Sequence, residues 1–173
     1  LHAPRDAEEI LGELSGELER RRGEEHAEGP RRFLIVHGLQ RLRALRRSEE
    51  DFGFGAESDT PSRPDQQFTR LLREGPSNGM HVIAWCDTVA NLERTLDRRS
   101  IREFDNRVPF QMSANDSTGL IDSPQAVNLG RHRAILFSEE LGQVEKFRPY
   151  APPGEDWLAR AIAQLAPRVA ASR

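Results

Sequence analysis

Polar side chains able to act on a ligand follow two apolar runs of the sequence. His37 comes directly after residues 33–36, and Asp87 follows residues 80–85 with Cys86 between them. A carboxylate at a strand end can hold Mg²⁺ through water, whereas imidazole is a poor ligand for this hard, oxygen-seeking ion. His37 is therefore either a catalytic group or, as is more common, a strand-end histidine with a structural hydrogen bond. Asp87 is either a ligand contact or part of an ordinary helix start, and the second interpretation is favoured.

Cysteine and histidine content argues against disulfide and metal chemistry. Cys86 is the single cysteine, which excludes a disulfide within the chain and any CxxC motif. No activating partner lies near it in the sequence, so a small buried residue is a better interpretation than a nucleophile. The five histidines show no HxxxH or HExxH spacing, so no metal site is predicted. This cysteine usage fits a reducing compartment, and we expect a cytoplasmic location.

Residues 115–122 form a second polar cluster, which contains Asp116 and Ser117. Carboxylates and hydroxyls in such a cluster can serve a phosphate or metal site. Ordinary turn chemistry explains the same residues equally well.

Arginines dominate the basic side chains. The net charge is −3, and Lys146 is the only lysine. A GxxxxGK[ST] phosphate-binding loop is therefore absent from the chain, because no Gly-Lys pair exists. One basic stretch could face nucleic-acid phosphates or could be a solvated helix face balanced by the acidic segment after it. Its members are Arg41, Arg43, Arg46 and Arg47.

Apolar periodicity predicts alternating helices and strands. A helix is expected from Asp6 to near Gly23, and another over residues 65–74. Residues 33–36 and 80–85 have the length and apolar density of strands buried on both faces. Further expected elements are short helices at 89–96 and 99–104, a strand at 107–112, a loop and short helix at 116–129, a hairpin at 132–138 and 143–150, and an amphipathic helix at 157–169.

This order predicts an α/β fold with a mostly parallel sheet, in which ligands bind at the carboxyl ends of the strands. No apolar stretch approaches the roughly 18 residues needed to cross a bilayer. The sequence begins at Leu1 without an apolar signal core, and we expect a soluble piece excised from a larger parent protein.

The ordered series of strand ends resembles the later half of the FtsK/SpoIIIE motor domain, a RecA-like ATPase of DNA translocases with relatives in type VII secretion. Residues 33–42 look like that family's Walker B strand. Residues 71–87, LLREGPSNGMHVIAWCD, are similar to its helix, glycine turn and sensor strand. The most specific match is residues 106–130, NRVPFQMSANDSTGLIDSPQAVNLG, and the whole likeness spans residues 33–150.

The resemblance implies a partial ATPase domain at residues 1–150, with a RecA-like sheet flanked by helices and ending in an antiparallel hairpin. Residues 151–173 would be a linker and an amphipathic helix. The P-loop strand would lie upstream of this chain, which leaves the sheet incomplete. The parent would use ATP and Mg²⁺. This fragment alone is not expected to bind or hydrolyse ATP, because His37 and Gly38 stand here in place of the family's two Walker B carboxylates.

The resemblance also implies a function and partners. The leading hypothesis is part of an ATP-driven DNA translocase of cell division, acting on double-stranded DNA as a homo-oligomeric ring whose parent could be membrane-anchored. The alternatives are a type VII secretion-like module that moves protein, and a pseudo-ATPase scaffold. The nucleotide-site candidates are His37, Asp87, Asp116, Ser117 and Arg131, the last reaching a neighbour's phosphates; the DNA-contact candidates are the four arginines named above.

Overall fold

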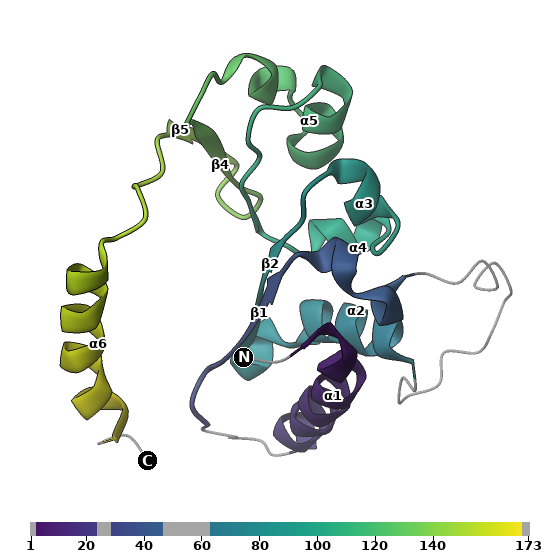
Figure 1. The fold of residues 1–173 in the computed structure, drawn as a ribbon. Helices are drawn as coiled ribbons and strands as arrows, with labels where there is room; N and C mark the ends of the chain where they lie inside the picture. Colours follow the sequence, from purple (N-terminus) through teal and green to yellow (C-terminus); the bar gives the residue numbers. More distant parts are fainter. Residues whose placement is uncertain (1–2, 24–28, 47–62, 171–173) are drawn as a thin grey trace, which may run out of the picture. The chain divides into compact units, whose positions relative to one another are not determined.

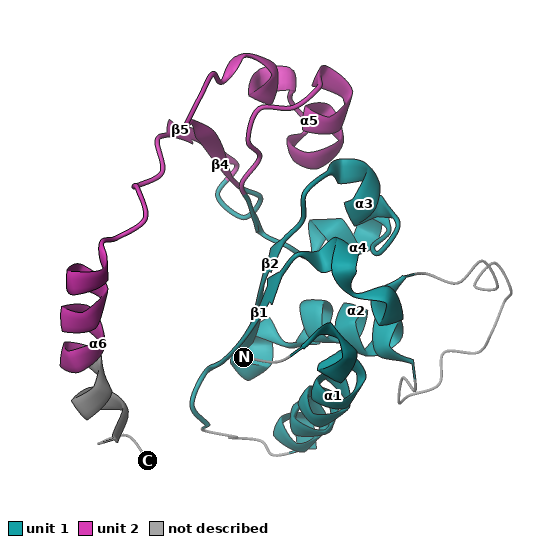
Figure 2. Cartoon of the chain, in the orientation of Figure 1, with its two compact units in different colours: residues 1–107, 138–141 teal, residues 108–137, 142–173 magenta. Residues whose placement is uncertain are grey.

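A computed structural model describes residues 3–23, 29–46 and 63–170 of the chain, the last six of them by their backbone alone. The chain divides into two compact units (Figure 2). Unit 1 is residues 1–107 with residues 138–141, and unit 2 is residues 108–137 with residues 142–173. Each unit is described by itself. The predicted division at residue 150 stays a prediction.

Unit 1 contains a parallel pair of strands with helices on one face (Figure 1). Its longer elements are α1 (Ala7–Gly23), β1 (Arg32–His37), α2 (Pro64–Glu74) and β2 (Met80–Trp85). Short elements are the 3₁₀ turns η1 (Pro4–Asp6), η2 (Leu39–Arg41), η3 (Arg43–Leu45) and η5 (Pro76–Asn78), the helices α3 (Val89–Glu93) and α4 (Arg98–Arg102), and strand β3 (Asn106–Arg107).

Strands β1 and β2 run in the same direction, in register from Arg32 opposite Met80 to His37 opposite Trp85. A parallel pair needs a crossover connection, and α2 belongs to the one between them. This confirms the predicted α/β fold and the side-by-side, parallel placement of the two apolar runs. One face of this sheet packs on α1 and α2. The core between them consists of Leu18, Leu71 and Met80, with Leu14, Leu34 and Val82 packed against these three.

A glycine joins α2 to β2 at a close approach of the backbone. The N–H of Gly75 donates to the carbonyl of Leu71 over 2.9 Å, and its own carbonyl accepts from the N–H of Met80 over 2.8 Å. A Cβ at this position would lie 2.6 Å from the Met80 carbonyl oxygen and closer still to that of Leu71. Only glycine fits there without a shift of backbone, so this residue sets where β2 begins.

A buried arginine holds the beginnings of both strands. The guanidinium of Arg21, whose residue is 3% exposed, donates to the carbonyl of Asn78 over 2.9 Å and to that of Pro30 over 3.0 Å. Its Nε also donates to Oε1 of Glu17 over 2.7 Å. Hydrogen bonds from Arg20 and Arg21 lower the pKa of Glu17 to about 2. Pro30 precedes β1 and Asn78 precedes β2, so one side chain of α1 fixes both strand starts.

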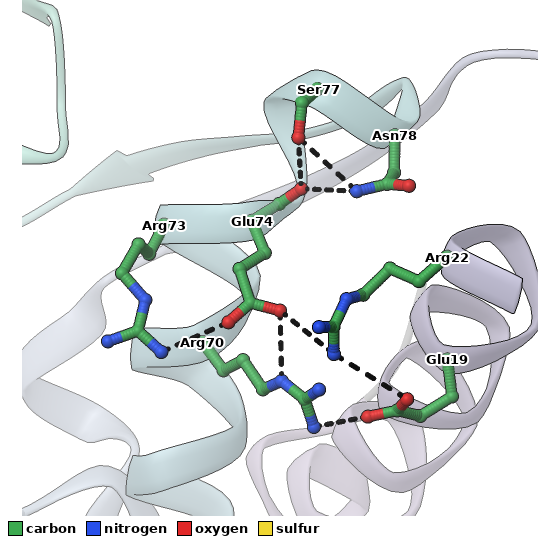
Figure 3. Close-up of polar contacts among 7 residues, drawn as sticks. All are labelled: Glu19, Arg22, Arg70, Arg73, Glu74, Ser77 and Asn78. Carbon is green, nitrogen blue, oxygen red and sulfur yellow. Dashed lines mark hydrogen bonds and ion pairs between the residues drawn. The ribbon is translucent and has the colours of Figure 1, made fainter. Parts of the chain in front are cut away.

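A charged network ties α1 to α2 (Figure 3). Arg70 of α2 pairs with Glu19 of α1 and, through Nε, with Oε2 of Glu74 over 3.1 Å. Arg22 of α1 reaches the same Glu74 oxygen at 3.4 Å. Burial alone would raise the pKa of Glu74, but hydrogen bonds from Arg73 and Arg70 outweigh it and the pKa is lowered. The ionised carboxylate is therefore the form that bridges the helices.

Unit 2 has its own small core. Its elements are α5 (Ala114–Ile121), η6 (Pro124–Asn128), most of β4 (Ala134–Ser138), β5 (Gln143–Phe147) and α6 (Glu155–Ala170). The core consists of Ile121, Ala126, Leu129 and Ile135. The hydroxyl of Ser117 ties α5 to η6, since it donates to the Ser123 carbonyl over 2.5 Å and accepts from the Ala126 N–H over 3.2 Å.

Strands β4 and β5 are neighbours in an antiparallel sheet, which confirms the predicted hairpin. The strand expected over residues 107–112 was too long, because β3 ends at Arg107. Pro109, two residues further on, has no N–H to donate to a ladder. Its carbonyl still accepts from Ile135 over 3.1 Å. Among the helices in the described ranges, none has the length and apolar character to cross a membrane.

Candidate functional site

The end of β1 carries a stacked pair of rings. The imidazole of His37 lies against the indole of Trp85, with ring centroids 4.9 Å apart and planes 11° from parallel. The Gly38 N–H donates to the Trp85 carbonyl over 3.1 Å and so continues the contact between the strands. Both rings are exposed. Within the described residues His37 makes no side-chain hydrogen bond, so stacking replaces the structural hydrogen bond that the sequence suggested.

The residue after His37 is held in a left-handed conformation. Gly38 has φ of 86° and ψ of 60°, a region that residues with a Cβ rarely adopt. Its carbonyl accepts from the Arg41 N–H over 2.9 Å, which closes η2. The chain therefore turns sharply at the end of β1 and leaves His37 as its last outward-facing side chain.

The end of β2 carries a short polar network. Thr88 begins α3, since its Oγ1 accepts from the Asn91 N–H over 3.2 Å. The Asn91 side chain donates to Oδ1 of Asp87 over 2.9 Å, and this bond lowers the pKa of Asp87. The expected helix start is present, but Thr88 is its cap, and Asp87 is an exposed carboxylate steadied by the next turn.

Cys86 lies half-buried between β2 and this network. Its Sγ is 3.5 Å from the carbonyl oxygen of Thr88 and 3.8 Å from Oδ1 of Asp87. Burial raises the pKa of the Cys86 thiol. Since the thiolate is the nucleophilic form, this environment supports a small packing residue rather than a reactive cysteine.

Mg²⁺, which an ATPase of the RecA-like kind uses, does not fit these strand ends. The ion favours carboxylate oxygens, but β1 ends in His37 and Gly38. Asp87 already accepts a hydrogen bond from Asn91. Across the described ranges no three His, Cys, Asp or Glu side chains gather where they could hold a metal. We therefore assign no reaction step through Mg²⁺ or a nucleotide to this chain.

Three other nucleotide-site candidates belong to unit 2. Ser117 is fully buried and its hydroxyl serves the packing of α5 on η6. Asp116 is half-buried in the first turn of α5, where its N–H donates to the Ser113 hydroxyl. Arg131 is exposed on the turn before β4, and in the described part of the chain no side chain pairs with it. Of the three, Arg131 is the best placed to meet another molecule.

The predicted DNA-contact arginines follow β1. Arg41 and Arg43 lie on η2 and η3, and Arg46 comes directly after η3. All three are exposed, and none makes an ion pair within the residues that the structure describes. Arg47 lies outside the described residues. The structure thus brings three of the four candidates to one short stretch of unit 1.

Sequence reasoning missed two contributors to the strand ends, the indole of Trp85 and the amide of Asn91. The signal for Trp85 was its position in β2, equal to that of His37 in β1, because in-register parallel neighbours face each other. The signal for Asn91 was its spacing of four residues from Asp87, which places the two on one side of a helical turn.

The two sheets and their helices form an α/β arrangement consistent with part of a RecA-like fold. Among solved structures, the cytoplasmic domain of the Thermomonospora curvata Type VII Secretion ATPase EccC is similar, with a TM-score of 0.53 and 18% sequence identity. The likeness covers 87% of this chain and 18% of that chain, so this chain spans less than a fifth of that relative's length. No family model and no curated protein matches the sequence.

Proposed function

We propose that this chain is a nonhydrolysing module of an ATP-driven translocation machine of the FtsK/SpoIIIE kind, and that the cargo is protein. The observation that carries the proposal is the likeness in fold to the type VII secretion ATPase. The resemblance of residues 33–42, 71–87 and 106–130 to segments of that family points to the same class from the sequence.

The nonhydrolysing character follows from the chemistry of the strand ends. If β1 corresponds to the Walker B strand that it resembles, His37 stands where hydrolysis requires a carboxylate for Mg²⁺. Its ring is stacked on Trp85. Without that ion the developing charge on a transferring phosphate is not neutralised. In a ring such a module would hold its neighbours in place or complete the site of a neighbouring subunit.

Calorimetry of this chain with ATP in the presence of Mg²⁺ tests the first part. We expect no binding heat at ATP concentrations that saturate an active ATPase. Tight binding would contradict the expectation that this chain alone does not bind ATP. Release of phosphate from ATP by the isolated chain would overturn the nonhydrolysing role and leave the fold assignment untouched.

Arg131 is the side chain we propose for a contact with phosphates held by a neighbouring subunit. Its side chain is exposed and makes no ion pair among the described residues. A cation that contacts another subunit must be accessible in this way. In the assembled parent, Arg131→Ala should slow ATP turnover. Arg133→Ala, which removes another exposed charge two residues away, is the matched control. Equal turnover in the two variants would remove this role.

Double-stranded DNA is the second candidate cargo, and the three exposed arginines after β1 favour it. The salt dependence of the binding affinity distinguishes the two cargoes. DNA affinity should fall steeply between low and moderate salt, by a logarithmic slope of roughly 0.9 for each phosphate contacted. Fluorescence anisotropy of a labelled duplex measures this. Undetectable duplex binding together with salt-insensitive capture on a peptide array supports protein cargo, and the reverse supports DNA.

A pseudo-ATPase scaffold is the third candidate, with α6 and the arginines as partner-binding elements. Calorimetry of the intact parent distinguishes it. A scaffold binds no nucleotide anywhere in the assembly, whereas a motor module belongs to a parent that does.

A further inference from the structure

The chain passes from α2 into β2 through an asparagine–glycine pair. Asn78 ends η5, and Gly79 follows it with φ of 70° and ψ of 23°, a left-handed conformation that glycine adopts without strain. Among the asparagines of the sequence, Asn78 alone precedes a glycine. Both residues are half-buried. The pair is chemically distinct because glycine has no side chain to shield its backbone nitrogen, the atom next along the chain from the asparagine.

An asparagine–glycine pair can lose ammonia by itself. The Gly79 nitrogen, after its proton passes to water, attacks Cγ of Asn78. The bond from Cγ to Nδ2 breaks, and Nδ2 takes up a proton from solvent and leaves as ammonia. The product is a succinimide ring. Water then opens one of the two carbonyl–nitrogen bonds of the ring, which leaves either an aspartate or an isoaspartate whose main chain runs through Cγ. Water is the only co-reactant.

The folded turn holds both reacting groups in hydrogen bonds (Figure 3). Nδ2 of Asn78 donates to the carbonyl of Glu74 over 2.7 Å and to Oγ of Ser77 over 3.3 Å. The N–H of Gly79 donates to the carbonyl of Pro76 over 3.2 Å. The nucleophile therefore keeps its proton, and the side-chain amide is fixed on the preceding turn. These bonds must break before the nitrogen can attack Cγ.

The carbonyls of the pair are held as well. The carbonyl of Asn78 accepts from the buried guanidinium of Arg21 over 2.9 Å. The carbonyl of Gly79 accepts from the N–H of Arg32, the first residue of β1, over 2.8 Å. The turn is thus fastened to α1 and to β1, and the pair becomes free to react only when these contacts open. Local opening of this kind has its own free energy, which is at most that of global unfolding.

We propose that Asn78–Gly79 is a deamidation site that is protected while the beginnings of β1 and β2 are held and reacts when they open. Isoaspartate adds an atom to the main chain inside the turn that the Met80 N–H closes on the Gly75 carbonyl. Aspartate places a carboxylate oxygen against the carbonyl of Glu74, which loses its donor. Each product favours the open state, so the damage to unit 1 is irreversible and cumulative. This site does not depend on the cargo or on the nonhydrolysing role proposed above.

Incubation of the 173-residue chain at mildly alkaline pH, in buffer and in guanidinium chloride, tests the proposal. Trypsin cleaves after Arg73 and Arg94, so a single peptide carries Asn78 and also Asn91, which precedes leucine and is the internal control. Mass spectrometry with fragmentation measures the conversion of each. We expect Asn78 to react about tenfold more slowly, or slower still, in buffer than in denaturant. Asn91 should react more slowly than Asn78 in denaturant.

Two arginine variants test the protection. Arg21→Ala removes the bond to the Asn78 carbonyl and should speed the reaction in buffer by about tenfold. Arg20→Ala removes the neighbouring arginine, which pairs with Glu17 at the helix surface, and should match the wild-type rate. The comparison of buffer with denaturant needs no variant, so it holds even where Arg21→Ala does not fold.

Three results overturn the proposal. Equal rates at Asn78 in buffer and in denaturant would show that the turn gives no protection. A rate at Asn78 no higher than that at Asn91 in denaturant would show that the pair is not a deamidation site. A folded Arg21→Ala chain that reacts no faster than Arg20→Ala would show that the strand beginnings do not control the reaction.

Discussion

The two ends of the β1–β2 pair are built in opposite ways. At the beginning, the buried guanidinium of Arg21 binds backbone carbonyls next to both strands, and Gly75 lets α2 approach β2 closely. At the far end, His37 and Asp87 are exposed and interact with residues beside them. The alignment of the strands is thus fixed from one end, and the other end carries side chains that the fold does not require.

This difference separates stability from function within one small sheet. Substitutions at the strand beginnings should unfold unit 1, whereas substitutions at the strand ends should leave it folded and change what it binds. Trp85 lies in unit 1, so its fluorescence in a Trp157→Phe background reports the unfolding of that unit alone.

The largest effect is expected at Arg21. Arg21→Ala leaves the carbonyls of Pro30 and Asn78 and the carboxylate of Glu17 without their buried partner, which should cost about 3 kcal/mol of the free energy of unfolding. Urea denaturation measures it. Arg20→Ala, which removes an exposed partner of the same Glu17, should cost less than about 1 kcal/mol. Equal losses would show that the strand beginnings are not held by Arg21.

A somewhat smaller loss is expected at Gly75. In Gly75→Ala the new methyl group meets two backbone carbonyl oxygens, which cannot move independently of α2 and β2, at a cost of about 2 kcal/mol. Gly12→Ala is the matched control, because nothing lies within 4 Å of its Cβ position in α1. That variant should stabilise the unit by up to about 1 kcal/mol through helix propensity. Two substitutions of the same type should therefore have opposite signs.

Lowering the pH should reduce the free energy of unfolding through the carboxylates near the strand beginnings. The pKa of Glu17 is about 2 in the folded chain and 4.5 for an unperturbed glutamate, so its contribution is complete above pH 4.5 and is lost as pH falls toward 2. Glu74, whose pKa is also lowered, acts in the same direction. Glu17→Gln should flatten the decline of unfolding free energy over that window, whereas Glu13→Gln, at an exposed position, should leave the slope unchanged. Identical slopes for all three proteins would contradict the role of Glu17.

The sequence predicted the elements of the fold better than the groups that hold them. The parallel pairing followed from two apolar runs separated by a helical pattern, and the hairpin from two runs around a glycine turn. The role of Arg21 did not follow, because it lies among three consecutive arginines and only the tertiary fold shows that its side chain is buried. Expecting both faces of β1 to be buried failed for Phe33 and Ile35, since composition does not say which face is covered.

The candidate site was predictable in position and not in detail. His37 and Asp87 were identified from their places after the apolar runs, and both lie at the strand ends. The cap proved to be Thr88, because a one-residue change in where a helix begins exchanges the roles of neighbouring polar residues. Ser117 looked like a ligand group in the sequence. Its burial arises from the packing of η6 on α5, which local patterns do not encode.

The smallest effect is expected at the strand ends, where His37 stacks on Trp85 in solvent. A double-mutant cycle with His37→Ala, Trp85→Ala and both together should give a coupling energy of about 0.5 kcal/mol, the low end for ring pairs, because water competes at exposed rings. Thermal unfolding followed by circular dichroism does not depend on the indole fluorescence that Trp85→Ala removes. If His37→Ala destabilised unit 1 as much as Arg21→Ala, the strand ends would be as structural as the beginnings. A small coupling with intact folding leaves His37 available for binding, because the fold would then place almost no demand on its imidazole.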